Sequence, residues 1–94
     1  MSKQWWCYLL ECRDGTYYCG ITVNLNKRLN MHMSGKASRY TRGRLPVKYI
    51  ATNKCSSHKE ALKMEREVKK LPKSRKLQPF FSQERNLYAK DAIF

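Results

Sequence analysis

The chain has 94 residues, the size of one domain with a single core. Hydrophobic residues make up 41% of it and aromatic residues 12%, which excludes an intrinsically disordered chain. Lysine and arginine number 20 against 7 aspartate and glutamate, so the formal net charge is +13 at pH 7. A compact domain with this charge associates with polyanions, and nucleic acid is the leading class of partner.

The longest apolar run, residues 5–10, is too short to span a membrane and lacks the flanks of a secretion signal. We therefore expect a cytoplasmic protein that does not contact a membrane, with reduced cysteines. The cysteines do not form CxxC pairs, which argues against a zinc site; they are Cys7, Cys12, Cys19 and Cys55.

The first two predicted elements are strands over residues 5–12 (WWCYLLEC) and 16–22 (TYYCGIT), which are rich in aromatic and apolar side chains. The segment Arg13-Asp14-Gly15 between them is typical of a tight turn, so we predict a β-hairpin.

Two hairpin registers are compatible with this turn. A two-residue turn would pair Tyr8 with Ile21 and place Tyr8 and Tyr18 on opposite faces of the sheet. A three-residue loop, with Gly15 in the left-handed conformation, would instead pair Tyr8 with Gly20, and the two tyrosines would share a face. Tyrosines are common in strands, so the pattern alone favours a structural role for both.

A helix is predicted next, because Asn24 can cap a helix that starts near Leu25 and Gly35 can end it. Leu25, Leu29 and Met33 form an apolar stripe that we expect to face the core.

Arg28 and His32 are four residues apart and project from one face of this predicted helix, beside its apolar stripe. Together they can supply a phosphate clamp and a proton-handling group. A solvated Arg–His pair is the commoner outcome for such a pattern.

A basic loop over residues 35–44 follows, and then a third strand over residues 46–52 (PVKYIAT). No acidic residue occurs between Asp14 and Glu60, nor in residues 68–83, which indicates a surface that follows a phosphate backbone. The residues we expect to bind nucleic acid are Lys36, Arg39, Tyr40, Arg42, Arg44 and Lys69.

The sequence Ser57-His58-Lys59-Glu60 fits a capping box, so a second helix should run from there to about Leu71, before Pro72. Its apolar face includes Glu65. Burying an unpaired carboxylate is costly, so a salt bridge to a lysine or arginine is the favoured interpretation. A single inward-facing carboxylate beside a phosphate-binding surface also suits one Mg²⁺ ion.

Residues 73–94 are predicted to form one or two short helices. The order ββαβα plus a helical C-terminal tail gives an α+β domain with a small three-stranded antiparallel sheet flanked by helices.

These residues resemble the GIY-YIG nuclease family over about residues 5–77, and chain 1–94 is expected to be a single domain of this kind. Trp6-Cys7-Tyr8 stands at the first name motif and Tyr18-Cys19-Gly20 at the second. The segment NLNKRLNMH is similar to the family's helix with an arginine and a histidine, and ALKME is similar to the helix with its metal-binding glutamate. The resemblance is closest to small stand-alone bacterial members. Trp6, Cys7 and Cys19 depart from the family's glycine and isoleucines.

The resemblance implies a divalent-metal-dependent phosphodiesterase that cuts DNA. It implies that Tyr8 acts as general base or positions water, that Tyr18 assists, and that Arg28 neutralises charge in the transition state. It further implies that His32 orients the nucleophile or tunes a tyrosine, and that Glu65 holds one Mg²⁺ or Mn²⁺ ion.

Three functions remain open from the sequence. The first is a metal-dependent nuclease, with single-stranded or branched DNA as the preferred substrate, RNA not excluded, and a monomer as the expected state. The second is a nucleic-acid-binding module without catalysis, which would use Tyr40, Trp5 and Trp6 for stacking. The third is a partner of an acidic protein, which the charge alone would serve.

Overall fold

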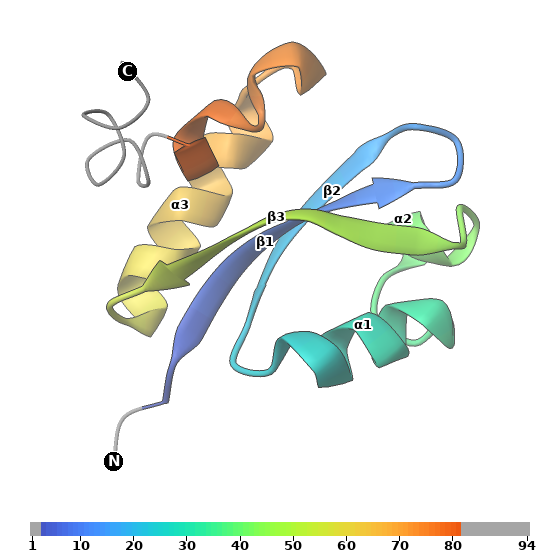
Figure 1. The fold of residues 1–94 in the computed structure, drawn as a ribbon, viewed down its shortest axis with the longest axis horizontal. Coiled ribbons are helices and arrows are strands. Elements are labelled where there is room, and N and C mark those ends of the chain that lie inside the picture. The colour runs from blue at the N-terminus through green and yellow to red at the C-terminus, as the bar shows by residue number, and fades with distance from the viewer. Residues whose placement is uncertain (1–2, 82–94) are drawn as a thin grey trace, which may run out of the picture.

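The structure is a computed structural model, and it describes residues 3–81. A three-stranded antiparallel sheet lies between two helical layers, with α1 and α2 on one side and α3 on the other (Figure 1). The strands are β1 (Trp5–Cys12), β2 (Tyr17–Thr22) and β3 (Val47–Cys55), in the order β2-β1-β3. The helices are α1 (Leu25–Met33), α2 (Arg39–Arg42), α3 (His58–Lys70) and the 3-10 turn η1 (Lys73–Arg75). The α+β prediction with this sheet is confirmed. No helix within residues 3–81 is long and apolar enough to cross a membrane.

The hairpin adopts the second of the two predicted registers. Tyr8 pairs with Gly20 and Leu10 pairs with Tyr18, so Tyr8 and Tyr18 share a face of the sheet. The loop has three residues and ends at Gly15, whose φ of 85° lies in the left-handed region that glycine adopts without strain.

Both long helices start at the predicted caps. The Asn24 side chain accepts from the Lys27 N–H, and the Ser57 hydroxyl accepts from the Glu60 N–H. α1 is followed by Gly35, which has a φ of 78° and lets the chain turn away from the helix. These caps are local signals, which explains why the helix boundaries were predictable.

Three details differ from the sequence prediction. Met33 is 45% exposed, because α1 ends there and turns His32 toward the sheet in its place. The predicted loop over 35–44 contains the short helix α2, capped by the Ser38 side chain. The third strand extends to Cys55, because its last residues pair with the start of β1.

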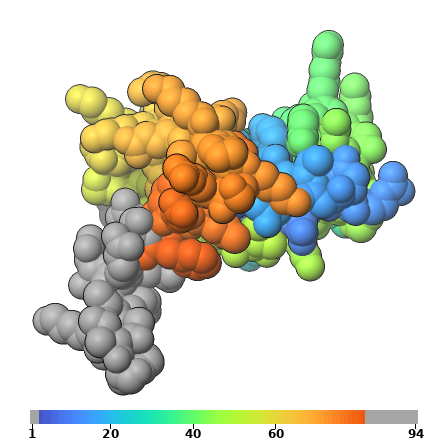
Figure 2. Space-filling model, turned by 90° about the horizontal axis from the view of Figure 1, so that it is seen from above, coloured from blue at the N-terminus to red at the C-terminus, as the bar shows by residue number. Residues whose placement is uncertain are grey.

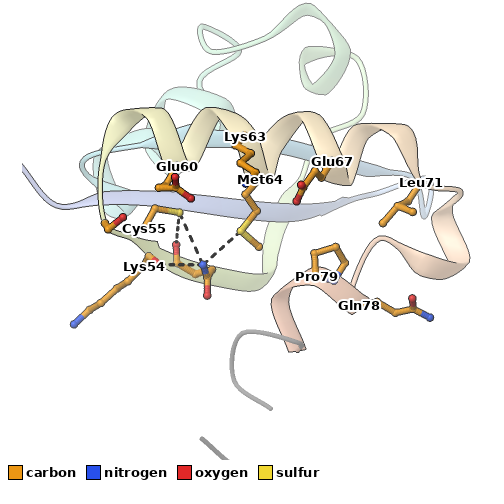
Figure 3. Close-up of a pocket in the computed structure, with 11 residues that line it drawn as sticks. Lys54, Cys55, Glu60, Lys63, Met64, Glu67, Leu71, Gln78 and Pro79 are labelled. Carbon is orange, nitrogen blue, oxygen red and sulfur yellow. Dashed lines mark hydrogen bonds between the residues drawn. The ribbon is translucent and has the colours of Figure 1, made fainter. Parts of the chain in front are cut away.

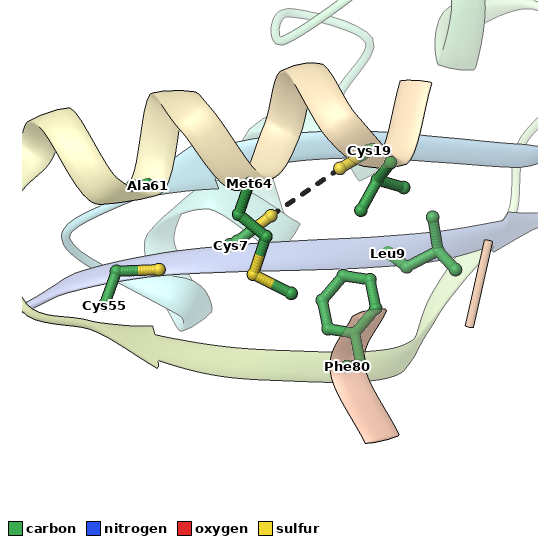
Figure 4. Close-up of a cluster of buried hydrophobic side chains, with 8 residues drawn as sticks. Cys7, Leu9, Cys19, Cys55, Ala61, Met64 and Phe80 are labelled. Carbon is green, nitrogen blue, oxygen red and sulfur yellow. Dashed lines mark hydrogen bonds between the residues drawn. The ribbon is translucent and has the colours of Figure 1, made fainter. Parts of the chain in front are cut away.

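The core has two parts, one on each face of β1. Cys7 and Leu9 pack toward α3, against Met64, Val68 and others (Figure 4). The Sγ atoms of Cys7 and Cys19 lie 3.7 Å apart. All four cysteines are free and buried. The hydrogen bond with Cys19 and burial raise the pKa of the Cys7 thiol, which therefore stays protonated.

On the opposite face, Tyr8 and Leu10 pack toward α1, with Leu25 and Leu29 against them. The segment after α3 reaches back toward the β1–β2 hairpin, as the adjoining orange and blue surfaces in Figure 2 show. There the Lys73 Nζ lies 4.8 Å from the centre of the Tyr17 ring. The basic segment after α3 thus contacts the hairpin at Tyr17, whereas Tyr8 and Tyr18 belong to the opposite face, toward α1.

Candidate active site

A buried chain of hydrogen bonds joins three elements at the centre of the α1 face. The Tyr8 hydroxyl, on β1, lies 2.9 Å from His32 Nε2, on α1. His32 Nδ1 lies 2.8 Å from the Thr41 Oγ1, on α2, and the Thr41 hydroxyl donates to the Ser38 carbonyl at 3.3 Å. Tyr8, His32 and Thr41 are all at most 1% exposed. In such surroundings a hydrogen bond is strong and an unpaired polar group is costly.

Gly20 makes room for the Tyr8 ring. A Cβ atom at position 20 would lie 2.6 Å from Tyr8 Cζ, and closer still to the hydroxyl. Burial is the main cause that raises the pKa of Tyr8 above its usual value of 10, and the neighbouring Tyr18 adds to it. At neutral pH Tyr8 is therefore a protonated phenol, held tightly in place.

Arg28 lies beside this chain, as the shared face of α1 predicts. The charge of its guanidinium opposes the rise in the pKa of Tyr8. Its charge also lowers the pKa of His32, after the larger effect of burial. The Arg28 side chain is half-buried, so one end of this hydrogen-bonded chain reaches toward the surface.

Tyr18 is the half-buried phenol of the pair. Its ring packs edge-on against His32 at 5.4 Å between centroids, and stacks with Tyr40 at 5.9 Å. The Arg44 guanidinium covers Tyr40 at 4.0 Å and binds the Asp14 carboxylate at 3.1 Å. Tyr40 and Arg44, both expected to bind nucleic acid, thus contact other side chains of the protein, and Tyr40 is still 37% exposed.

The other residues expected to bind nucleic acid are exposed. Arg39 and Arg42 lie on α2 and Lys36 lies just before it, so three cations surround the turn that carries Thr41. Lys69 is exposed on α3, and its Nζ lies 5.8 Å from the centre of the Tyr18 ring.

Glu65 comes to this region from the opposite helical layer. Its side chain is 21% exposed and forms a salt bridge with Lys69 at 3.3 Å, so the ion pair favoured by the sequence is present. Lys69 in turn contacts Tyr18, which connects Glu65 to the tyrosine side of the site. Tyr8, Tyr18, Arg28 and His32 thus form one cluster, and Glu65 joins it only through Lys69.

The donor set at Glu65 fits a Mg²⁺ or Mn²⁺ ion that also binds substrate. Within residues 3–81, no group of three or more His, Cys, Asp and Glu side chains lies together. A hard cation of this type takes one or two protein carboxylates and completes its shell with phosphate oxygens and water. Glu65 supplies one such partly exposed carboxylate, and a metal ion there would replace Lys69 as its cationic partner.

Two members of the cluster were not singled out from the sequence. Thr41 lies in the segment 35–44, which the sequence predicts to be a basic loop. Tyr49 lies edge-on against Tyr8 at 5.3 Å, and its hydroxyl donates to the Leu25 carbonyl at 2.7 Å. Burial raises the pKa of Tyr49 to about 12. The one signal for Tyr49 was its place in a predicted strand, and strand pairing with β1 brings it to Tyr8.

A cavity of about 630 Å³ lies elsewhere, between the end of β3, α3 and residues 78–79 (Figure 3). Lys54, Glu60, Lys63 and Glu67 line it with Met64 and other residues. None of the five predicted reacting groups contributes to its walls. The titratable groups that contact one another are instead those around His32.

Stability should fall as the pH drops from about 6.5 to about 4. Burial lowers the pKa of His32 from 6.5 to about 4, so in this window the unfolded chain binds a proton that the folded protein excludes. The free energy of unfolding should decrease by up to roughly 1.4 kcal/mol per pH unit. Urea unfolding of the parent and of His32→Gln across this range checks it. Equal pH slopes for the two proteins, or titration of the folded His32 near 6.5, would contradict it.

The fold and a comparison of the sequence with known protein families identify the family of the chain. Residues 4–78 match the model of the GIY-YIG catalytic domain, and the chain belongs to that family. The family's domain implies nuclease activity, and nucleases of this family generally use divalent metal ions. The prediction of a GIY-YIG member of the small bacterial type is confirmed.

Among similar proteins, a UPF0213 protein of Streptococcus pneumoniae is 44% identical over 93% of this chain and 89% of its own length. The solved structure of the protein EF2693 from E. faecalis is 36% identical, covers 87% of this chain and 90% of that one, and has a TM-score of 0.60. The solved structure of the UPF0213 protein BH0048 from Bacillus halodurans is 43% identical over 80% of each chain, with a TM-score of 0.51.

Proposed function

We propose that this protein is a divalent-metal-dependent endonuclease that hydrolyses phosphodiester bonds in single-stranded or branched DNA. One observation carries the proposal: a buried Tyr8–His32 hydrogen bond lies beside Arg28 and Tyr18, under a turn that exposes three cations. A module that only bound a polyanion would need the exposed charge but not the buried polar chain.

The reaction is the addition of water to phosphorus and the breaking of one bond from phosphorus to a sugar oxygen. One proton leaves the water and one reaches the leaving oxygen. Arg28 would bind the phosphate and neutralise the charge that grows on its oxygens, which is usually the largest contribution to such a rate. Glu65 would hold the Mg²⁺ or Mn²⁺ ion, which when bound stabilises the same charge as a Lewis acid.

Exposure separates the roles of the two tyrosines. Because Tyr8 is fully buried, its hydroxyl is not accessible to the attacking water. Tyr18 is half-buried, so we assign the contact with water or phosphate to Tyr18. Tyr8 and His32 would act by holding the Arg28 guanidinium in position.

The choice of substrate rests on size and charge. A domain of 94 residues with a net charge of +13 should bind phosphate backbones strongly, and this attraction does not depend on the base sequence. Single strands and branch points expose the backbone to a small basic surface. We propose that the monomer suffices, because all five reacting groups come from one chain.

A cleavage panel tests the proposal. Single-stranded, duplex and branched DNA of one sequence, and the matching RNA, are incubated with Mg²⁺, Mn²⁺ or EDTA. We expect cleavage of single-stranded or branched DNA with either metal and none with EDTA. Failure to cut any substrate would leave the non-catalytic binding module, which the Glu65–Lys69 ion pair favours. That alternative predicts mobility shifts that weaken with salt, whereas a partner of acidic proteins predicts no DNA binding at moderate salt.

A further inference from the structure

The hydrogen bonds around His32 have a fixed direction, which can be derived from both ends of the chain. A neutral imidazole donates through one ring nitrogen and accepts through the other. His32 is neutral above pH about 4, because burial lowers its pKa. Its two nitrogens face different partners, the Tyr8 hydroxyl at Nε2 and the Thr41 hydroxyl at Nδ1. The tautomer therefore decides which of the two hydroxyl groups gives a proton to the ring.

The Arg28 end gives the first argument. The Arg28 charge lies near enough to Tyr8 to act on its phenol, and a guanidinium only donates hydrogen bonds, so the side of the Tyr8 oxygen that faces Arg28 is best occupied by a lone pair. The phenol hydrogen of Tyr8 must then point elsewhere, and His32 Nε2 is 2.9 Å away. Nε2 accepts this hydrogen only when the ring proton is on Nδ1.

The Thr41 end gives the second argument. The Thr41 hydroxyl has one hydrogen, and the Ser38 carbonyl, 3.3 Å away, can only accept. Once that hydrogen points to Ser38, the Thr41 oxygen is left to accept from His32 Nδ1. The Ser38 carbonyl also accepts from the Arg42 N–H at 3.0 Å, so the helical turn of α2 fixes its place. Both ends of the chain thus favour the same Nδ1-protonated ring.

We propose that Thr41 is a positioning residue that holds His32 in the Nδ1-protonated tautomer. In this form Tyr8 donates to His32 and turns its oxygen lone pairs toward Arg28. In the other tautomer His32 would donate to Tyr8, and the phenol hydrogen would compete with the Arg28 guanidinium for the same side. Thr41 therefore acts on the guanidinium that faces the phosphate, through His32 and Tyr8.

Because the site is buried, the tautomer of His32 should depend on the single hydroxyl group of Thr41. Thr41 is 0% exposed and His32 is 1% exposed, so no bulk water is at hand to replace a lost partner. Thr41→Val keeps the shape of the side chain and removes the hydroxyl, whereas Thr41→Ser keeps the hydroxyl. The pair of variants separates hydrogen bonding from packing.

The test is ¹⁵N NMR of the imidazole rings at pH 7, which reports the tautomer whether or not the protein cuts DNA. We expect His32 in the parent and in Thr41→Ser to carry its proton on Nδ1, and Thr41→Val to shift toward the Nε2-protonated form. His58, the other histidine, is exposed against Trp5 and should be unchanged in all three proteins. A parent His32 protonated on Nε2, or no shift in a folded Thr41→Val, would overturn the proposal.

The effect on catalysis rests on the proposed function and is measured separately. Thr41→Val should lower the cleavage rate at least about 10-fold and Thr41→Ser should restore most of it. Loss of the tautomer with unchanged cleavage would refute the link to Arg28. If no variant cuts DNA, the nuclease proposal fails and the NMR result still decides the role of Thr41.

Discussion

Replacing Glu65 by glutamine is expected to lower the rate of DNA cleavage by about 10²–10³-fold, the range seen when one charge-stabilising group of an active site is lost. Glutamine keeps the size of the side chain and removes the negative charge that a divalent cation requires. The variant also loses its ion pair with Lys69, but pairs at this i, i+4 helix spacing contribute only about 0.3–0.5 kcal/mol, so the fold should persist. Cleavage rates against Mg²⁺ concentration, together with a melting curve, measure both effects.

Two further variants make this result specific. Glu67→Gln removes an exposed carboxylate from the same helix and should leave cleavage unchanged. Lys69→Met breaks the same ion pair but keeps Glu65, so it separates the loss of the ion pair from the loss of the metal ligand. If Lys69→Met were as inactive as Glu65→Gln while DNA binding stayed intact, or if Glu65→Gln cut as well as the parent, the metal-binding role of Glu65 would be wrong.

The second large effect is expected at Gly20. An alanine there would place its Cβ 2.6 Å from Tyr8 Cζ, inside the van der Waals contact distance. The Tyr8 ring is fully buried and cannot simply move aside, so overpacking should cost about 1–3 kcal/mol and lower the melting temperature by roughly 5–20 °C. A displaced Tyr8 would also lose its bond to His32, and cleavage should fall with it.

Gly43 is the matched control. Its φ is −88°, a value that alanine adopts readily, and a Cβ there would meet no atom within 4 Å. Gly43→Ala should therefore leave both the melting temperature and cleavage within error of the parent. Equal stability of Gly20→Ala and the parent would contradict the tight packing of Tyr8 against β2.

Much of the fold could be predicted because its signals are local. Asn24 and Ser57 are capping residues at the starts of helices, and the aromatic and apolar content of residues 5–12 and 16–22 marks the strands of the hairpin. The register of the hairpin was not decided locally, because both turn types suit the same residues. Packing decided it: only the register that places Gly20 beside Tyr8 leaves space for the buried ring.

The site was predictable in part, for the same reason. Arg28 and His32 are four residues apart in the sequence, which places them on one face of a helix. The structure brings both close to Tyr8. The burial of His32 in place of Met33 depends on a partner from another segment, Thr41, which no local pattern identifies. The pairing of Glu65 with Lys69 is an i, i+4 contact and was open to sequence reasoning.

β1 lies at the centre of the sheet, and this position determines how readily the parts of the site unfold locally. β1 pairs with a strand on each side and is covered on both faces, so its amide protons should exchange with deuterium only when the whole domain opens. α2 is a single four-residue turn at the surface, and its amides should exchange through much smaller fluctuations. The phenol of Tyr8 is thus anchored to a strand that should open slowly, whereas Thr41 belongs to a turn that should open far more readily.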